Sequence, residues 1–189
     1  MSAGPPPLNP PPLNPPLRGA GRKPDARFLL AHPAHVIALG LGSGLSPFAP
    51  GTAGTLLAWL AWVTLLPTAS DTMRAAVLLG ATLASWWAAT VTARHLAQAD
   101  PAAIVCDEIV AFWLVLWLVM PTGFWGQAAA FALFRFFDAV KPGPVAWADQ
   151  VFKPRRGRPL GWAQGFGIVF DDLVAALCTL VVIAIWRFA

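Results

Sequence analysis

Charged residues are scarce in this chain. Lys, Arg, Asp and Glu make up 12% of its 189 residues, whereas soluble domains carry about 25%. Hydrophobic residues account for 57%, and the mean hydropathy is +0.62. This composition excludes an ordinary soluble domain and predicts a single domain of the all-α class, an integral membrane bundle of about five membrane-embedded helices.

Several familiar catalytic centres are also missing. The two cysteines, Cys106 and Cys178, lie far apart in apolar segments, with neither zinc-ligand spacing nor the arginine that a cysteine phosphatase needs five residues later. The three histidines, His32, His35 and His95, show no metalloprotease or lipid-phosphatase spacing. A Walker GxxxxGK(S/T) motif and a GxSxG nucleophile elbow are both absent. Carboxylates therefore remain the main candidates for chemistry.

The N-terminal segment differs from the rest of the chain. It contains PPPLNPPPLNPPL followed by a small basic cluster, without an apolar run long enough for a signal peptide. Proline removes backbone donors and favours the extended polyproline II conformation. We expect residues 1–27 to be a disordered, basic tail and residues 28–189 to form the membrane-embedded domain.

Apolar stretches separated by prolines predict the helices of that domain. They indicate helices near 52–67, 73–95, 101–120, 123–140 and 167–187, and 28–41 is a candidate for a shorter interfacial helix. A spanning helix needs about 20 residues. Only Ala75–Ala93 reaches that length without a charged residue, so the other helices must include their polar ends.

Basic residues predict the orientation. With the N-terminus in the cytoplasm and five crossings, ten Lys and Arg residues lie on the cytoplasmic side, and only Arg74 and Arg187 lie on the far side. That asymmetry agrees with the positive-inside rule. The same orientation places Asp107, Glu108, Asp138, Asp171 and Asp172 at the cytoplasmic face.

Those five carboxylates, among nine acidic residues in all, form three clusters against apolar helices. An acid beside lipid-facing sequence is costly unless it is paired or bound to a metal. Arg135 and Lys141 are the only nearby cations in the sequence, so convergence of all five acids leaves an excess of negative charge. An all-oxygen set of this kind favours Mg²⁺, Mn²⁺ or Ca²⁺. Solvated helix ends and a proton or ion relay are the competing interpretations.

Two polar segments add to this prediction. The loop Gly40–Leu56 is rich in glycine, serine and threonine, so its backbone amides and the following helix N-terminus can bind an anion. The segment Lys141–Pro159 is basic and is typical of a cytoplasmic anchor to anionic lipids. An ordinary flexible loop and an ordinary positive-inside anchor are the simpler interpretations of the two segments.

Four sequence blocks, in order, resemble the phosphatidylglycerophosphatase A family of bacterial membrane lipid phosphatases. The blocks are GSGLSPFAPGTAGTL, VCDEIVAFW, FRFFDAVKPGPV and GFGIVFDDLVAAL, and the resemblance covers about residues 36–186. Two departures are the long basic linker before the last block and Gln164-Gly165-Phe166-Gly167, which replaces a more glycine-rich run.

The resemblance implies a Mg²⁺-dependent hydrolase that removes the terminal phosphate of a phospholipid, phosphatidylglycerophosphate, at the cytoplasmic face of the inner membrane. By motif, it implies a catalytic set, a metal-binding subset and substrate-binding residues. The catalytic set is Asp107, Glu108, Asp138, Asp171 and Asp172; the metal subset is Asp107, Glu108, Asp171 and Asp172; the substrate set is Ser43, Ser46, Thr52, Arg135 and Lys141.

Two non-phosphatase functions stay open at the level of sequence. A small ion or proton-coupled transporter would place its carboxylates at the bilayer midplane, whereas these lie near helix ends. A non-catalytic membrane scaffold would leave lipid composition unchanged after alanine substitution of Asp171 or Asp172. No nucleic-acid or protein partner is inferred.

Overall fold

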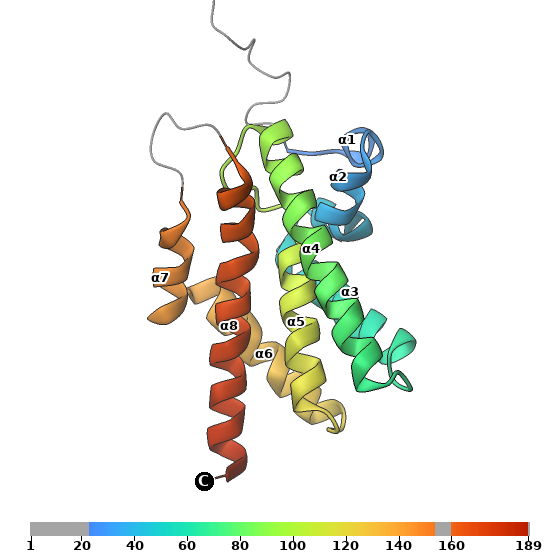
Figure 1. The fold of residues 1–189 in the computed structure, drawn as a ribbon, viewed down its shortest axis with the longest axis vertical. Helices are drawn as coiled ribbons and strands as arrows, with labels where there is room; N and C mark the ends of the chain where they lie inside the picture. Colours follow the sequence, from blue (N-terminus) through green and yellow to red (C-terminus); the bar gives the residue numbers. More distant parts are fainter. Residues whose placement is uncertain (1–22, 154–159, 189) are drawn as a thin grey trace, which may run out of the picture.

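A computed structural model describes residues 23–153 and 160–188, and every regular element in these ranges is a helix (Figure 1). The predicted all-α class is therefore confirmed for the part of the chain that the structure describes. The elements are α1 (Ala26–Leu30), α2 (Pro33–Ala38), η1 (Gly40–Leu45), α3 (Pro50–Leu65), α4 (Asp71–Leu96), α5 (Cys106–Val119), α6 (Phe124–Val140), α7 (Pro144–Val151) and α8 (Trp162–Phe188).

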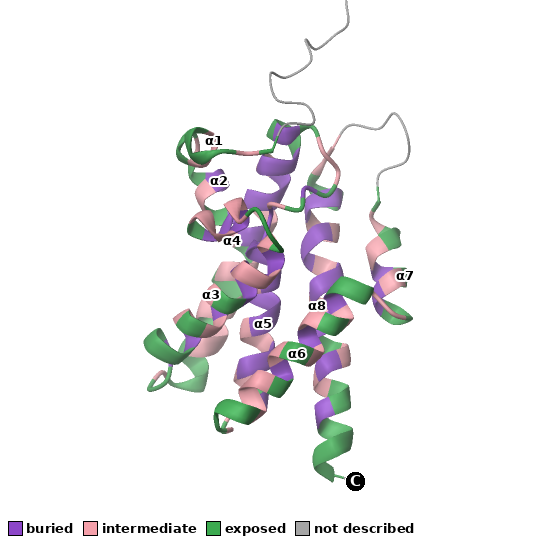
Figure 2. Cartoon of the chain, turned by 180° about the vertical axis from the view of Figure 1, so that it is seen from behind, coloured by how far each residue is buried: buried purple, intermediate pink, exposed green. Residues whose placement is uncertain are grey.

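Helix α5 lies at the centre of the bundle. It packs against α3, α4, α6 and α8, while α7 packs on α8 and α2 packs on α4. Seen from behind, buried residues gather on α5 and on the faces of α4 and α8 that meet it, and the C-terminal end of α8 is exposed (Figure 2). The first turn of α5 and the middle of α8 are consequently shielded from solvent.

Aromatic side chains fill the core around α5. Phe112 and Phe134 are fully buried, and their rings stack with centroids 5.6 Å apart. Trp62 from α3 is also buried in this cluster, 6.3 Å from the ring of Trp113. Burying a side chain of this size contributes about 1.5–3 kcal/mol, so this cluster fixes α3 and α6 against α5.

The five predicted long helices are all present, with two shifted starts. Helix α5 begins at Cys106 rather than near 101, because the Val105 amide donates to the Ala38 carbonyl at 2.9 Å and holds the preceding segment outside the helix. Helix α8 begins at Trp162 and so includes Gln164. Helix α7 was not predicted; Pro144 occupies its first turn, where proline is tolerated.

Two of the described helices, α4 and α8, are long and apolar enough to cross a membrane. Helices α3, α5 and α6 have 16, 14 and 17 residues, which is shorter than the roughly 20 residues of a full span. The expectation of about five crossings therefore stays a prediction for these three helices.

Two sequence-based predictions concern residues outside the described ranges. Most of the predicted tail, 1–27, lies there, although Ala26 and Arg27 already belong to α1. The basic residues Arg155, Arg156 and Arg158 lie there as well. The segment 28–41 was a candidate for a shorter interfacial helix. It contains α2 and most of α1, which begins two residues earlier.

We expect Gly165→Ala to destabilise the fold. A methyl group at Gly165 would overlap the Thr90 side chain and lie 2.8 Å from Thr90 Cα, so α8 and α4 would have to separate. Overpacking of this kind costs about 1–3 kcal/mol, and the change should lower the thermal unfolding midpoint in detergent micelles.

Gly80→Ala is the matched control for that substitution. A methyl group there meets nothing within 4 Å, and alanine is favoured over glycine inside a helix by about 1 kcal/mol. Equal shifts of the two unfolding midpoints would contradict close packing between α4 and α8 at Gly165.

Candidate functional site

The first turn of α5 carries two buried acids. Asp107 and Glu108 directly follow Cys106, whose carbonyl accepts a hydrogen bond from Ser85 of α4 at 3.3 Å. The Glu108 amide donates to Asp107 Oδ1 at 3.0 Å. A helix N-terminus favours negative charge, so the backbone partly offsets the cost of burying these carboxylates.

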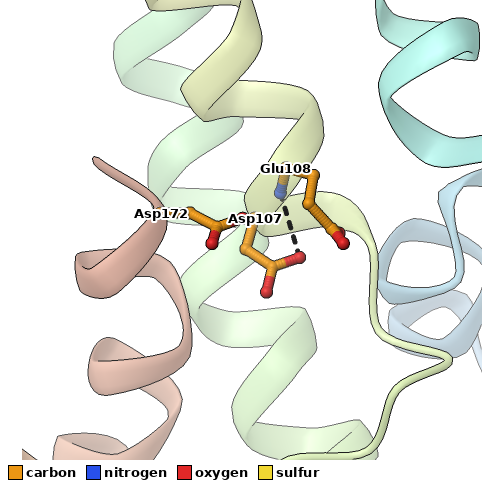
Figure 3. Close-up of side chains that lie close together, drawn as sticks. All are labelled: Asp107, Glu108 and Asp172. Atoms are coloured by element: carbon orange, nitrogen blue, oxygen red, sulfur yellow. Dashed lines mark hydrogen bonds between the residues drawn. The ribbon is translucent and has the colours of Figure 1, made fainter. Parts of the chain in front are cut away.

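Asp172 of α8 completes a group of three carboxylates. One oxygen from each of Asp107, Glu108 and Asp172 lies within 4.8 Å of the others. Figure 3 shows the three side chains converging from α5 and α8. All three residues are buried, with at most 9% of their surface exposed. We call this group the carboxylate trio.

Helix α6 brings an arginine to the trio. Arg135 Nη1 lies 3.5 Å from Glu108 Oε1 and also donates to the Asp138 carboxylate one turn further along α6. Asp138 itself is 8% exposed. Arg135 therefore pairs with Asp138, and the same guanidinium reaches the trio.

Lys141 bridges two other acids. It ends α6 in a left-handed conformation with φ of 49°, and its Nζ donates to Asp171 and, at 2.8 Å, to Asp149 Oδ1. Burial alone would lower the pKa of Lys141, but the hydrogen bonds and charges of Asp149 and Asp171 outweigh it and raise that pKa. Lys141 is therefore a permanent cation beside the trio.

These residues line one cavity of about 270 Å³. Six acidic and two basic side chains contribute to its wall: Asp100, Asp107, Glu108, Asp138, Asp171, Asp172, Arg135 and Lys141. The structure thus brings all five predicted catalytic carboxylates and both predicted cations to one place. We call it the catalytic cavity, after the role that the family resemblance implies for these carboxylates.

The glycine-rich loop reaches the catalytic cavity through its backbone. Ala49, Pro50 and Gly51 line the wall, and a methyl group at Gly51 would overlap Glu108 Oε1 and lie 3.0 Å from Arg135 Nη1. Only glycine allows the backbone of α3 to approach the acid and the guanidinium this closely.

The hydroxyl groups predicted to bind substrate lie elsewhere. Ser43 Oγ donates to the Gly40 carbonyl at 2.9 Å, and Ser46 Oγ donates to the Phe48 carbonyl at 2.7 Å. Neither serine lines the catalytic cavity, and neither does Thr52. Their role in substrate binding remains a prediction that the arrangement of the described residues does not favour.

Three carboxylate oxygens at the cavity are buried without a hydrogen-bond partner among the described residues. They belong to Glu108, Asp171 and Asp172. Leaving a buried acceptor unpaired costs about 1–3 kcal/mol, and more for a charged group. Oxygen-rich acid clusters of this type suit Mg²⁺, Mn²⁺ or Ca²⁺, so the donor set fits a divalent cation.

Most of the bundle matches a known family. The family model for phosphatidylglycerophosphatase A matches residues 36–187. Two proteins named phosphatidylglycerophosphatase A are similar: that of Escherichia coli is 35% identical over 155 residues, with 80% of this chain and 82% of the relative covered. That of Haemophilus influenzae is 32% identical over 160 residues, covering 85% and 92%. The chain belongs to the phosphatidylglycerophosphatase A family.

A further relative bears a different name. A Bacteroides thetaiotaomicron protein, provisionally named a phosphatidylinositol-3-phosphatase, is 40% identical over 159 residues, with 80% of this chain and 92% of the relative covered. No solved structure matches the chain. Membership of the family makes the protein an enzyme, a lipid phosphatase.

Sequence reasoning missed Asp149, which was not among the predicted site residues. Asp149 lies on α7, where its two carboxylate oxygens accept from Lys141 and Lys153. A sequence signal for this position exists, because Pro144 can begin a helix after α6 ends at Lys141-Pro142. That helix, α7, places Asp149 next to Lys141.

Asp149→Asn should lower the activity of this family member. The ammonium group of Lys141 has three N–H donors. Asp149 and Asp171 each accept one of them, so the positions of these two acids set the direction of the third N–H. Hydrogen bonds to charged groups contribute about 1.5–3 kcal/mol, and we expect kcat/KM for phosphate release from its lipid substrate to fall about tenfold or more.

Asp71→Asn is the control for that measurement. Asp71 bonds Arg74 and Trp117 at the start of α4, is exposed, and does not line the cavity. Equal kcat/KM values for wild type and Asp149→Asn would show that Lys141 needs no anchor on α7.

Proposed function

We propose that the protein is a Mg²⁺-dependent phosphatidylglycerophosphatase, which hydrolyses phosphatidylglycerophosphate to phosphatidylglycerol and phosphate. The observation that carries the proposal is the carboxylate trio, with its unpartnered oxygens, in one cavity with Arg135 and Lys141. The substrate comes from the names of the two phosphatidylglycerophosphatase A relatives.

Asp107, Glu108 and Asp172 would hold the metal ion. Asp171 was also predicted as a ligand from the family motif; here its carboxylate bonds Lys141, while its other oxygen remains free. A bound Mg²⁺ neutralises phosphate oxygens and lowers the pKa of a coordinated water. Without that charge, the acids of the cavity would repel a phosphate.

Arg135 and Lys141 are placed to bind the terminal phosphate. Both line the cavity, and a guanidinium can make paired hydrogen bonds to phosphate oxygens. In hydrolysis, a water oxygen forms a bond to phosphorus as the bond from phosphorus to the headgroup oxygen breaks. A free carboxylate oxygen at the cavity accepts a proton from the attacking water. The carboxylic acid so formed then gives this proton to the departing headgroup oxygen, which leaves as an alcohol and restores the carboxylate.

The membrane arrangement supports a lipid substrate. Helices α4 and α8 are each long and apolar enough to cross a bilayer, and the C-terminal half of α8 exposes Leu177, Val181 and Ile185. Asp171 and Asp172 lie in the half of α8 nearer its N-terminus. We infer that the cavity opens at the cytoplasmic face of the inner membrane, where the basic residues of the sequence concentrate.

The test is phosphate release from phosphatidylglycerophosphate in mixed micelles by purified protein, with Mg²⁺ and with EDTA. Wild type should release phosphate only with Mg²⁺. Asp172→Asn removes one anionic ligand, and activity should fall about 100-fold or more, with Asp71→Asn as the charge-matched control outside the cavity.

Two results would count against the proposal. Phosphate release that persists in EDTA would contradict the metal requirement. Absence of release by folded wild type would contradict the assignment of phosphatidylglycerophosphate as the substrate. Phosphatidylinositol 3-phosphate should be assayed alongside, because the relative at 40% identity carries that name. Faster release from the inositol lipid would change the assigned headgroup while leaving the site chemistry intact.

Arg135→Lys should separate charge from geometry at the same site. Lysine retains the positive charge but loses the planar pair of donors, so Asp138 and the phosphate can no longer be bound together. We expect a several-fold rise in KM and roughly a tenfold fall in kcat in the micelle assay. Arg74→Lys, at a residue of α4 that does not line the cavity, is the control. Unchanged kinetics for Arg135→Lys would exclude a bidentate contact.

A further inference from the structure

A second cavity adjoins the catalytic cavity. Its volume is about 210 Å³, and it shares Asp100, Ile168 and Asp171 with its neighbour. The rest of its wall comes from α7 and the two residues after it, from α8 and from the residue before Asp100: Asp149, Phe152, Lys153, Gln164, Gly167 and Ala99. We call it the side cavity. The mechanism described above makes no use of it.

Gln164 is the distinctive residue of the side cavity. It is only 7% exposed, and its Nε2 donates to the Ala99 carbonyl, which fixes the orientation of the amide. Its Oε1 is buried and has no hydrogen-bond partner among the described residues. A buried amide oxygen in this condition calls for a donor from outside the protein.

Asp171 provides a second free acceptor on the same wall. Its Oδ1 is also buried without a partner among the described residues. Gln164 and Asp171 are seven residues apart on α8, which places them on one face and about 10 Å apart along the axis. One residue with a free acceptor, Asp171, therefore lies on the wall that the two cavities share, and the other, Gln164, lies on the wall of the side cavity.

The free acceptors of the side cavity select the kind of ligand. Among the described residues, its wall contains three acids, Asp100, Asp149 and Asp171, and one cation, Lys153, which is bound to Asp149. Lys141 also bonds Asp149 and Asp171. The oxygens left free on this wall belong to an amide and a carboxylate, which accept hydrogen bonds from hydroxyl groups, whereas an anion offers them no donor. A neutral, hydroxyl-bearing group matches this chemistry.

We propose that the side cavity binds the hydroxyl-bearing part of the lipid headgroup, and that Gln164 determines specificity for it. The inference rests on the proposed function, because the phosphomonoester must lie in the catalytic cavity for the headgroup to reach the shared wall at Asp171. A site that bonds a substrate hydroxyl discriminates against an analogue that lacks it, because the buried acceptor is then left unpaired.

The experiment compares two lipids and two glutamine variants in mixed micelles at a fixed surface fraction. The lipids are phosphatidylglycerophosphate and its deoxy analogue, in which the headgroup is built on propane-1,3-diol. The variants are Gln164→Met, which keeps side-chain length but removes the acceptor, and Gln150→Met, the same change at an exposed residue of α7.

Wild type and Gln150→Met should both cleave the hydroxylated lipid with about three- to tenfold higher kcat/KM than the deoxy lipid, the range expected for one hydrogen bond. Gln164→Met should lose this preference through a slower reaction with the hydroxylated lipid alone. Its unchanged rate with the deoxy lipid reports that the variant is folded.

Other outcomes overturn the inference in distinguishable ways. Equal kcat/KM values of wild type for the two lipids, or an equal loss on both lipids in Gln164→Met, would show that the side cavity holds only water or supports the fold, and the phosphatase would stand. Failure of wild type to release phosphate from either lipid would overturn the proposed function and the headgroup pocket together.

Discussion

The repulsion among buried carboxylates is the constraint on which the site depends. Asp107, Glu108 and Asp172 bring oxygens within 4.8 Å of one another where water has little access. Like charges at that separation are unfavourable at any dielectric constant that a protein interior offers. The fold must therefore supply positive charge at this junction of α5 and α8, and in the function proposed here a divalent cation would add to the charge of the side chains.

The surrounding helices supply the rest of that charge by different routes. Helix α6 contributes Arg135 beside Glu108, and Lys141, which caps its C-terminus, bonds Asp171. Helix α7 then returns along α8 and anchors Lys141 through Asp149. The aromatic core around α5 fixes these helices without contributing chemistry, so packing and charge are arranged by separate sets of residues.

The acid clusters could be predicted from sequence because carboxylates are conspicuous within apolar helices, and their convergence followed from the orientation of those helices. Asp149 could not, since its role depends on how α7 folds back after Lys141-Pro142. The role of the glycine-rich loop depends on tertiary contacts in the same way. The Ser43 hydroxyl bonds the loop's own backbone, and the loop approaches the site through Gly51, so substrate binding by Ser43 stays a prediction. Sequence pattern identifies which residues are unusual; which of them meet is decided by tertiary contacts.

The most direct test of the account is metal binding by the trio itself. Mn²⁺ can replace Mg²⁺ at oxygen sites, and its electron paramagnetic resonance signal distinguishes bound from free ion in purified protein. The account predicts stoichiometric binding by wild type, displaced by Mg²⁺ and lost in Asp172→Asn. Undiminished Mn²⁺ binding in Asp172→Asn, or no binding by folded wild type, would contradict it.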